Sequence, residues 1–340
     1  MARPLVTIIS PTYNQERFVA ACAESALAQT YTEWEQIFVD DGSSDGTRDV
    51  LARFRDPRIR VVVLPHAGVG ALDRTYNAAL AVARGSLIAI LEGDDCWAAD
   101  KLAVQVPSFE DASTFLSWGR AELIDERGAL VGEAARLATG SMCTRIPADV
   151  AFRRLTRSNF LTPTVTVMVR RTALERSGGF RQSGSSLLVD LPTWLWATAT
   201  QDGHVAFLNH PLGRYRVHGA QTSQRRRAQM TREHFAIVQA VVSELDTSAL
   251  ARVQWDERAR RSAESRARLA EGEVALETGE FRAARAAFLR ALGAAPNPGD
   301  RALSAVGVLS SILRRNLVRS AFSARARLQR VLRGRPPVTG

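Results

Sequence analysis

Short, almost uninterrupted apolar runs alternate with helical patterns through the first hundred residues, and they restrict the fold more than any other feature. The runs cover residues 5–9, 36–39, 59–64 and 87–91, and helix-like spacing covers residues 18–28, 47–54 and 71–83 between them. Strands that are apolar at every position are typical of a parallel sheet buried on both faces, with helices as crossovers. The sequence therefore predicts a βαβαβαβ series in an α/β fold.

Polar residues stand where three of these strands end. Residues 10–14 read SPTYN, residues 40–43 read DDGS and residues 92–95 read EGDD. Ligands of such sheets bind beyond the carboxyl ends of the strands, so we expect the three segments to converge on one crevice.

Asp94 and Asp95 are adjacent carboxylates at the mouth of a buried strand. They repel each other and lose hydration there, so a divalent cation, Mg²⁺ or Mn²⁺, is the expected counter-charge, with positions left for a diphosphate. The alternative is an acidic turn after a strand.

Asp40 and Asp41 offer a different chemistry at the neighbouring strand end. A carboxylate there can accept a hydrogen bond from the imide of uracil or the corresponding donor of guanine. Tyr13 is placed to pack on that base or its ribose, or else to fill space at the rim.

After residue 100 the pattern becomes mixed. Strand-like segments cover residues 114–118, 164–169 and 205–208, and helical ones cover 148–154, 172–177 and 191–199. We expect residues 1–100 to form a nucleotide-binding half and residues 101–224 an acceptor-binding half of one catalytic domain.

Residues 225–340 form a separate helical and basic region. They carry 22 Lys and Arg against 11 Asp and Glu, whereas residues 1–224 carry 23 against 24. Residues 272–296 have the spacing of one tetratricopeptide-type hairpin, which must stack on something else. A following stripe of Val306, Leu309, Leu313 and Leu317, edged by arginines, suits either an anionic membrane surface or packing on protein. Self-association is a further alternative, and nucleic acid fits poorly because aromatic side chains are scarce there.

The cellular setting follows from features that the sequence lacks. It shows no signal-peptide pattern and no apolar stretch of membrane-spanning length. We expect a cytoplasmic protein, with peripheral contact at the inner face of the cell membrane as an option.

Taken together, the motifs resemble those of a family 2 glycosyltransferase of the GT-A fold, a Rossmann-like, mostly parallel sheet with helices on both faces. The resemblance covers residues 4–224 and rests on ISPTYNQERF, VDDGSSDGT, GVGALDRTYNAALAVARGSLIAILEGDD and, more weakly, RYRVHGAQTS. It implies that the nucleotide is bound by Pro11, Tyr13, Asp40, Asp41, Arg74 and Asp94. It also implies that Asp95 coordinates the metal, and it gives His218 as a metal or diphosphate contact, with Arg216 or Gln221 sharing that role. Glu92 stands where the family usually has an aspartate.

The same resemblance assigns the catalytic base to Asp190. The family segment EDYDLWLR is matched here by residues 189–196, VDLPTWLW. Val189, Pro192 and Trp196 depart from that pattern, which puts the acceptor contacts in question. The alternative role of Asp190 is to cap a helix.

The expected activity is an inverting transfer of sugar from a nucleotide-diphosphate sugar, with UDP as the expected nucleotide, to a glycan or lipid-linked acceptor in cell-surface polysaccharide synthesis. Two alternatives remain. One is a nucleotidyltransferase of related sheet architecture, and the other is a catalytically impaired nucleotide-sugar-binding scaffold of a polysaccharide assembly.

Overall fold

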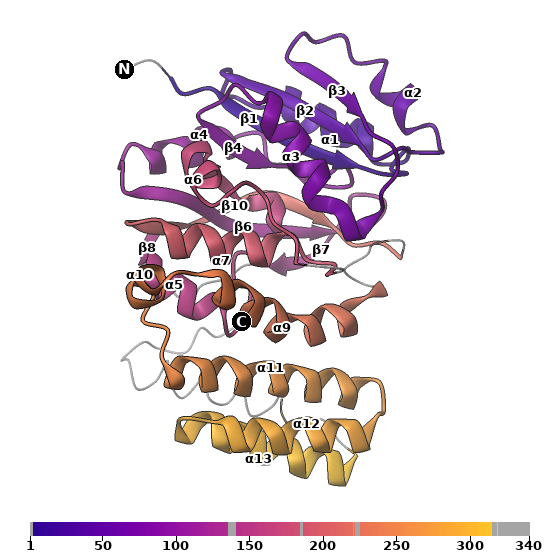
Figure 1. Ribbon diagram of the computed structural model, residues 1–340. Coiled ribbons are helices and arrows are strands. Elements are labelled where there is room, and N and C mark those ends of the chain that lie inside the picture. Colours follow the sequence, from indigo (N-terminus) through magenta and orange to yellow (C-terminus); the bar gives the residue numbers. More distant parts are fainter. Residues whose placement is uncertain are drawn as a thin grey trace. The chain divides into compact units, whose positions relative to one another are not determined.

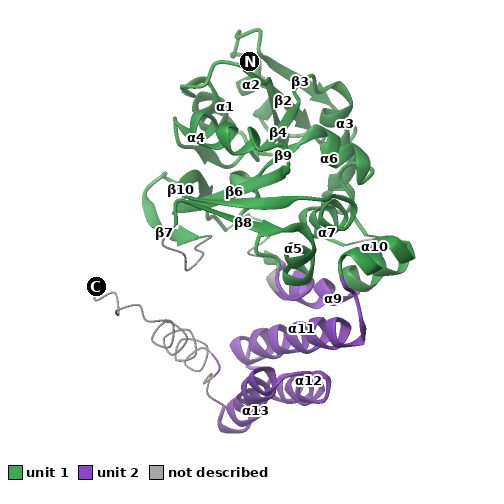
Figure 2. Cartoon of the chain, turned by 90° about the vertical axis from the view of Figure 1, so that its left-hand side faces the viewer, with its two compact units in different colours: residues 1–155, 159–225, 237–253 green, residues 156–158, 226–236, 254–340 purple. Residues whose placement is uncertain are grey.

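A computed structural model describes residues 3–134, 141–183, 186–219, 221, 225–314 and 318. The chain divides into two compact units (Figure 2). The first comprises residues 1–155, 159–225 and 237–253, and the second comprises residues 156–158, 226–236 and 254–340. Helix α9 (Arg227–Glu244) contributes to both units, so the boundary expected at residue 224 stays a prediction.

The first half of the first unit follows the predicted alternation of strands and helices. Its strands are β1 (Val6–Thr12), β2 (Trp34–Asp40), β3 (Ile59–Val63) and β4 (Leu87–Ile90). The crossovers are α1 (Val19–Leu27), α2 (Thr47–Leu51), and η1 (Val69–Ala71) with α3 (Leu72–Val82). These strands pair in parallel in the order β3-β2-β1-β4 (Figure 1).

Burial follows the position of each strand in the sheet. Every residue of β1, β2 and β4 is buried, as their apolar runs predict. Strand β3 departs from the expectation of burial on both faces, because it lies at the sheet edge and leaves Val61 and Val63 exposed.

The second half adds mixed strands to the same sheet. They are β5 (Cys96–Trp97), β6 (Thr114–Ile124), β7 (Leu130–Ala134), β8 (Cys143–Pro147), β9 (Met168–Arg170) and β10 (His204–Arg216). Strand β9 runs antiparallel to both β4 and β6 and thereby joins the two halves. Strand β10 is parallel to β6 and reaches Arg216, so its end comes close to the turn after β4.

The helices of this half are α4 (Lys101–Gln105), η2 (Val106–Phe109), α5 (Ala148–Leu155), η3 (Thr164–Thr166), α6 (Arg171–Arg176), α7 (Asp190–Thr200) and α10 (Thr247–Arg252). The three helices expected here are confirmed as α5, α6 and α7. The prediction of a strand over residues 164–169 is wrong for residues 164–166, which form η3. Thr166 donates to the carbonyl oxygen of Pro163 through both its backbone N–H and its hydroxyl, which closes a 3-10 turn instead.

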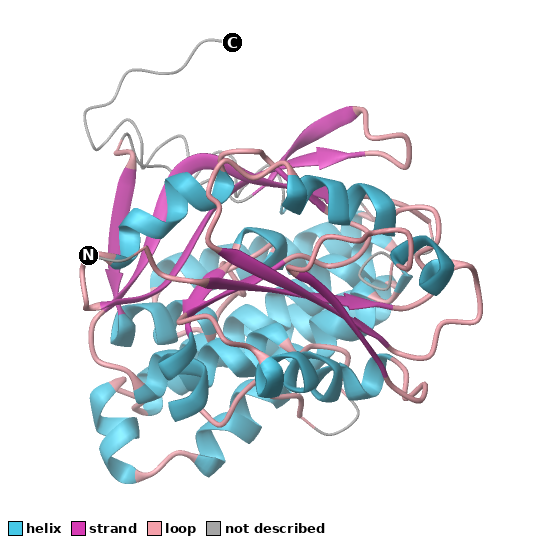
Figure 3. Ribbon diagram, turned by 90° about the horizontal axis from the view of Figure 1, so that it is seen from above, coloured by secondary structure: helices cyan, strands magenta, loops and turns pink. Residues whose placement is uncertain are grey.

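Helices lie on both sides of the sheet when it is viewed from above (Figure 3). A core cluster forms where α1 packs on the strands; Ile8, Cys22, Ala26, Phe38 and Ala89 are members, each fully buried. This packing holds β1, β2 and β4 rigidly, so the loops at their carboxyl ends have fixed starting points.

The C-terminal unit contains the antiparallel helices α11 (Glu257–Glu277) and α12 (Phe281–Ala294), followed by α13 (Pro298–Leu313). A helical hairpin was expected here and is present. Phe288 is fully buried between Gly272 and Gly307. Of the expected stripe, Leu309 and Leu313 are exposed and Leu317 lies outside the described residues. Among the described helices, none is long and apolar enough to cross a membrane.

Candidate active site

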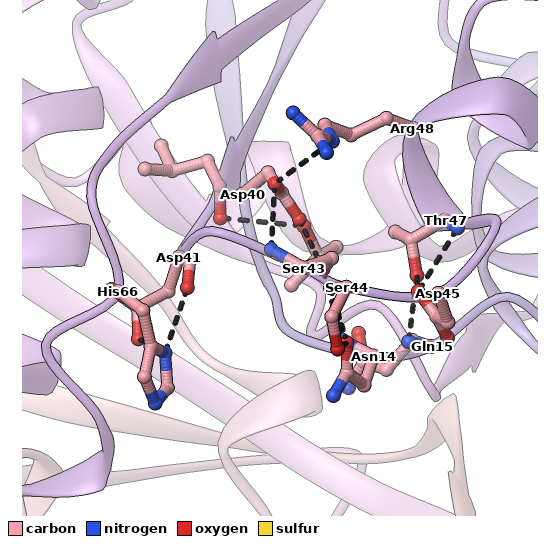
Figure 4. Close-up of polar contacts among 12 residues, drawn as sticks. Asn14, Gln15, Asp40, Asp41, Ser43, Ser44, Asp45, Thr47, Arg48 and His66 are labelled. Carbon is pink, nitrogen blue, oxygen red and sulfur yellow. Dashed lines mark hydrogen bonds and ion pairs between the residues drawn. The ribbon is translucent and has the colours of Figure 1, made fainter.

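Asp40 is the last residue of β2 and Asp41 follows it, but the two face different partners (Figure 4). The Asp40 side chain has no exposed area, and its carboxylate accepts hydrogen bonds from the backbone N–H of Ser43 at 3.0 Å and from the Ser43 hydroxyl. These hydrogen bonds between Asp40 and Ser43 stabilise the turn after the strand. The Asp41 carboxylate accepts hydrogen bonds from the backbone N–H groups of Ala67 and Gly68, each at 3.0 Å.

His66 is a member of this site that the sequence did not single out. Its Nδ1 lies 3.0 Å from Oδ2 of Asp41, and its ring stacks on Tyr13 with centroids 4.1 Å apart and an interplanar angle of 17°. Gly42 makes this approach possible, because a Cβ there would lie 2.7 Å from the backbone nitrogen of His66. The ends of β1 and β2 thus present a carboxylate beside a stacked aromatic pair.

Two further residues predicted to bind nucleotide lie at this edge. Pro11 is in β1, paired with Val39 of β2. Arg74 is an exposed residue in the first turn of α3, and its Nη1 lies 3.4 Å from the carbonyl oxygen of Pro65, next to His66. Its guanidinium is therefore within the same loop cluster and has room to reach a phosphate or a base.

A second cluster follows β4 and consists of Glu92, Asp94 and Asp95. Glu92 accepts a hydrogen bond from the hydroxyl of Tyr76 at 3.0 Å. Burial, followed by the charge of Asp94, raises the pKa of Glu92 to about 7. Burial together with the charges of Asp94 and Glu92 also raises the pKa of Asp95 well above its ordinary value. Three crowded carboxyls of this kind favour a counter-charge.

The end of β10 supplies part of that counter-charge. The backbone N–H of Arg216 donates to Oδ1 of Asp95 at 2.7 Å, and its guanidinium donates to the carbonyl oxygens of Asp94 and Asp125 at 2.8 and 3.0 Å. His218 follows, with Nε2 3.1 Å from Oδ2 of Asp94. Gln221 donates to the carbonyl oxygen of Arg216. The sequence predicted that Arg216 or Gln221 shares the metal or diphosphate contact of His218, whereas in the structure Arg216 anchors the acidic turn.

Asp190 begins α7, and it lies near enough for its charge to raise the pKa of Glu92. Its Oδ1 accepts from the backbone N–H of Leu191 at 2.8 Å, and its Oδ2 accepts from Nδ2 of Asn159 at 2.6 Å. Burial raises the pKa of Asp190, and these two hydrogen bonds oppose the rise. The predicted base therefore begins a helix, is held by two hydrogen bonds, and interacts electrostatically with Glu92 of the acidic cluster.

The acidic turn fits a divalent cation chemically. Oδ2 of Asp95 is buried and has no hydrogen-bond partner among the described residues, while Asp94 pairs with His218. Carboxylate oxygens suit Mg²⁺ and Mn²⁺, and imidazole suits Mn²⁺ as well. No ready-made group of three or more ligating side chains is found within the described part of the chain. A cation at this turn would therefore need oxygen ligands from its substrate.

Side-chain amides tie the segment after residue 176 to helix α3 and the 3-10 turn before it. Asn77 of α3 exchanges two hydrogen bonds with the backbone of Phe180, at 2.8 and 2.9 Å. Gln182 bonds the carbonyl oxygen of Val69 at 2.8 Å and the N–H of Asp73 at 3.2 Å. These contacts hold Phe180 and Gln182 against α3 and the turn before it, and no local sequence signal indicates them.

An α/β sheet with acidic groups gathered beyond the carboxyl ends of its strands has them where sheets of this kind bind their ligands. The model of the family described as Glycosyl transferase family 2 matches residues 7–176, which is half of the chain. The chain belongs to this family, so the expected enzyme class is confirmed.

Two curated bacterial relatives illustrate the likeness. The teichuronic acid biosynthesis glycosyltransferase TuaG of Bacillus subtilis is 32% identical over 218 residues, which cover 63% of this chain and 80% of the relative. WfgD of Escherichia coli, a UDP-Glc:alpha-D-GlcNAc-diphosphoundecaprenol beta-1,3-glucosyltransferase, is 39% identical over 129 residues, which cover 38% of this chain and half of the relative.

Solved structures show the same fold. TarS 1-349 of S. aureus, in complex with UDP-GlcNAc, has a TM-score of 0.60 at 17% identity, covering 94% of this chain and 92% of that one. The mannosyltransferase PcManGT of Pyrobaculum calidifontis, in complex with GDP-Man and Mn²⁺, has a TM-score of 0.55 at 21% identity, covering 96% and 85%. The predicted GT-A fold is thereby confirmed.

Proposed function

We propose that the chain is an inverting glycosyltransferase that uses a UDP-sugar and a glycan or lipid-linked acceptor in cell-surface polysaccharide synthesis. The observation that carries the proposal is the acidic turn after β4, where Oδ2 of Asp95 is buried without a hydrogen-bond partner among the described residues and Nε2 of His218 lies 3.1 Å from Oδ2 of Asp94. A base and a diphosphate site at one sheet edge are what a single displacement requires. WfgD is named for UDP-Glc and a lipid-diphosphate acceptor, and TuaG for teichuronic acid, which supports this choice of substrates.

Each residue has a role in this proposal. Asp41, Tyr13 and His66 would hold the base, and Arg74 would neutralise phosphate oxygens. Asp94, Asp95 and His218 would hold Mg²⁺ or Mn²⁺, whose contribution is to stabilise the departing diphosphate. Asp40 would act by shaping the turn that presents Asp41.

Asp190 would take the proton of the acceptor hydroxyl. As it does so, the hydroxyl oxygen bonds to the anomeric carbon, and the bond from that carbon to the diphosphate oxygen breaks with its electron pair going to UDP. Attack from the face opposite the leaving group inverts the anomeric centre. Backbone donation from Leu191 and side-chain donation from Asn159 keep the carboxylate oriented.

Placement in the cell is part of the same proposal. We place the enzyme in the cytoplasm, with residues 225–340 in contact with the inner membrane face or with a second copy. Leu309, Ile312 and Leu313 on α13 are exposed apolar side chains available for either contact.

Incubation of the full chain with a panel of UDP- and GDP-sugars, Mn²⁺ and simple glycoside acceptors tests the activity. We expect UDP release coupled to acceptor consumption, with NMR of the product showing an inverted anomeric configuration. Retention of configuration would contradict the single displacement. Pyrophosphate release would favour the nucleotidyltransferase alternative, and donor binding without turnover would favour the scaffold.

A further inference from the structure

Asn159 makes the shortest described hydrogen bond to the base candidate. It lies between α5 and η3, 31 residues from Asp190 in the chain, and its Nδ2 is 2.6 Å from Oδ2 of Asp190. The motif around residues 189–196 contains no trace of this partner. The contact thus joins the base to a segment that the sequence analysis left without a role.

The orientation of the Asn159 amide is determined by chemistry. An ionised carboxylate only accepts hydrogen bonds, so the amide must turn its NH₂ group to Asp190. Its Oδ1 then faces elsewhere. This oxygen is buried and has no hydrogen-bond partner among the described residues. A buried acceptor without a partner is costly, so it favours a ligand that brings a donor.

The segment that carries Asn159 is held firmly. The next residue, Phe160, packs edge-on against Trp118, with ring centroids 5.3 Å apart. Leu161 and Trp118 are both buried, with at most 1% of their surface exposed. Asn159 therefore projects from a fixed backbone, which is the property that a group needs in order to orient another side chain.

The geometry points to Asn159 as a positioning residue for Asp190 that also recognises the acceptor, with Nδ2 fixing the base and Oδ1 accepting a hydrogen bond from a second acceptor hydroxyl. This inference rests on the proposed function. The carboxylate of Asp190 and the amide of Asn159 are neighbours. The acceptor class is therefore a sugar whose reacting hydroxyl stands beside a free hydroxyl. The reacting hydroxyl gives its proton to Asp190, and the neighbouring hydroxyl keeps its own and donates to Asn159.

Few other charges of the described residues act on Asp190 from its surroundings. Glu92 and Tyr76 are the titratable groups on which the charge of Asp190 acts. On the helices packed against α7, Arg153 pairs with Asp149 and Arg171 with Glu175, while Arg252 of α10 pairs with Asp202 in the loop after α7. Of the other charged residues on these helices, Arg154 is exposed, and Arg176 donates to Oε1 of Gln201 at 3.3 Å. The hydrogen bond from Asn159 is therefore a direct and separable influence on Asp190.

The first experiment compares Asn159→Ala with the wild-type enzyme, using Ser158→Ala as a control at the exposed neighbouring position. Loss of a hydrogen bond to the ionised base raises its pKa, so the acid limb of the kcat–pH profile should move up by roughly one pH unit. At neutral pH, kcat should fall about 10- to 100-fold, because the base is less well oriented. The KM for the UDP-sugar should change less than about 2-fold, since Asn159 does not contact the donor.

Asn159→Asp separates positioning from folding. When two carboxyls lie side by side, the second proton leaves at a raised pKa, because the two negative charges repel each other. The acid limb should therefore move further in Asn159→Asp than in Asn159→Ala. Thermal unfolding and UDP binding with Mn²⁺ show whether each variant is folded. An unshifted acid limb in both folded variants would overturn the positioning role.

The second experiment uses the glycoside acceptor that the wild-type enzyme glycosylates best and its analogue in which the adjacent hydroxyl is replaced by hydrogen. With the wild-type enzyme, kcat/KM should be roughly 10- to 100-fold lower for the analogue than for the complete acceptor. With Asn159→Ala, the two acceptors should have nearly equal kcat/KM, because the contact to the second hydroxyl is already lost. An equal loss in both proteins would overturn the acceptor contact. If the wild-type enzyme transfers no sugar at all, the proposed function fails instead, and the two failures are thereby distinguished.

Discussion

Asp95 is held on one side only: the backbone N–H of Arg216 binds Oδ1, and Oδ2 is buried without a partner among the described residues. Asp95→Asn removes a carboxyl crowded by Asp94 and Glu92. We expect transfer to fall by at least about 10²-fold, because electrostatic stabilisation of the leaving group is lost. Without metal, the free energy of unfolding should stay level or rise, because a buried repulsion is relieved. Parallel activity and chemical denaturation assays check both; full activity in the presence of Mn²⁺ would contradict the assignment.

The raised pKa of Asp190 has a consequence for the pH dependence of the reaction. Burial favours the protonated carboxyl, whereas a base must be ionised to accept a proton. The rate should therefore rise with pH through an acid limb that lies above the ordinary range of aspartate. Steady-state kcat between pH 4 and 8 measures this limb. Asp190→Asn should lose about 10³-fold or more in kcat and bind UDP normally; a fully active variant would exclude Asp190 as the base.

Lys101 is the single lysine of the sequence and is fully buried at the start of α4. Its Nζ lies 3.7 Å from the centroid of the Trp97 ring and has no hydrogen-bond partner in the described parts of the chain. Burial lowers the pKa of Lys101 well below its ordinary value. Lys101→Met should therefore keep or raise the free energy of unfolding, whereas Lys101→Arg should lower it by about 2 kcal/mol or more, because a guanidinium stays charged. Urea unfolding compares the two; equal stabilities would contradict this account.

At the scale of elements, the packing of the C-terminal helices depends on close approach around Phe288. A Cβ at Gly307 of α13 would lie 2.3 Å from the Phe288 ring, whereas Gly293 of α12 has nothing within 4 Å of such an atom. Gly307→Ala should thus destabilise the C-terminal unit by about 1–3 kcal/mol through overpacking. Gly293→Ala should stabilise it by up to about 1 kcal/mol through helix propensity. Calorimetric unfolding of both variants checks the contrast, and a stable Gly307→Ala would show that this packing is loose.

The elements that sequence reasoning located are those with a strong local pattern. Apolar runs identified β1, β2 and β4 because these strands are buried throughout. The same pattern overstated the burial of β3, since strand order and not composition puts it at an edge. The expected strand at residues 164–169 begins as a turn because Thr166 donates to the carbonyl oxygen of Pro163 through both its backbone N–H and its hydroxyl, which no periodicity reports.

The residues of the candidate site also differ in whether a local sequence pattern reveals them. Asp41, Asp94 and Asp95 were predicted from their positions at strand ends, and Asp190 from a motif that a family resemblance aligned. His66 and Asn159 were missed because each is a single loop residue whose partner lies 25 or 31 residues away in the chain. Arg216 was given a ligand role, while its main contacts are to backbone carbonyl oxygens. Long-range side-chain contacts of this kind leave no signal in one sequence.

At the scale of the whole molecule, the sheet order explains how distant segments form one site. Strands β1 and β2 bring Tyr13 and Asp41 together, β4 adds the acidic turn, and β10 returns to anchor that turn through Arg216. Asn77 of α3 then holds the backbone of Phe180. All the residues assigned to the candidate site lie in the near-neutral residues 1–224, and the excess of basic residues lies in residues 225–340.

The central claim is that this acidic sheet edge binds a nucleoside diphosphate together with a divalent cation, and titration calorimetry of UDP into the full chain tests it most directly. We predict saturable binding with Mn²⁺, weaker by roughly 10-fold or more in EDTA and in Asp95→Asn. Equal affinity with and without the cation would contradict the role of the acidic turn. No heat from UDP or GDP under either condition would contradict the whole account.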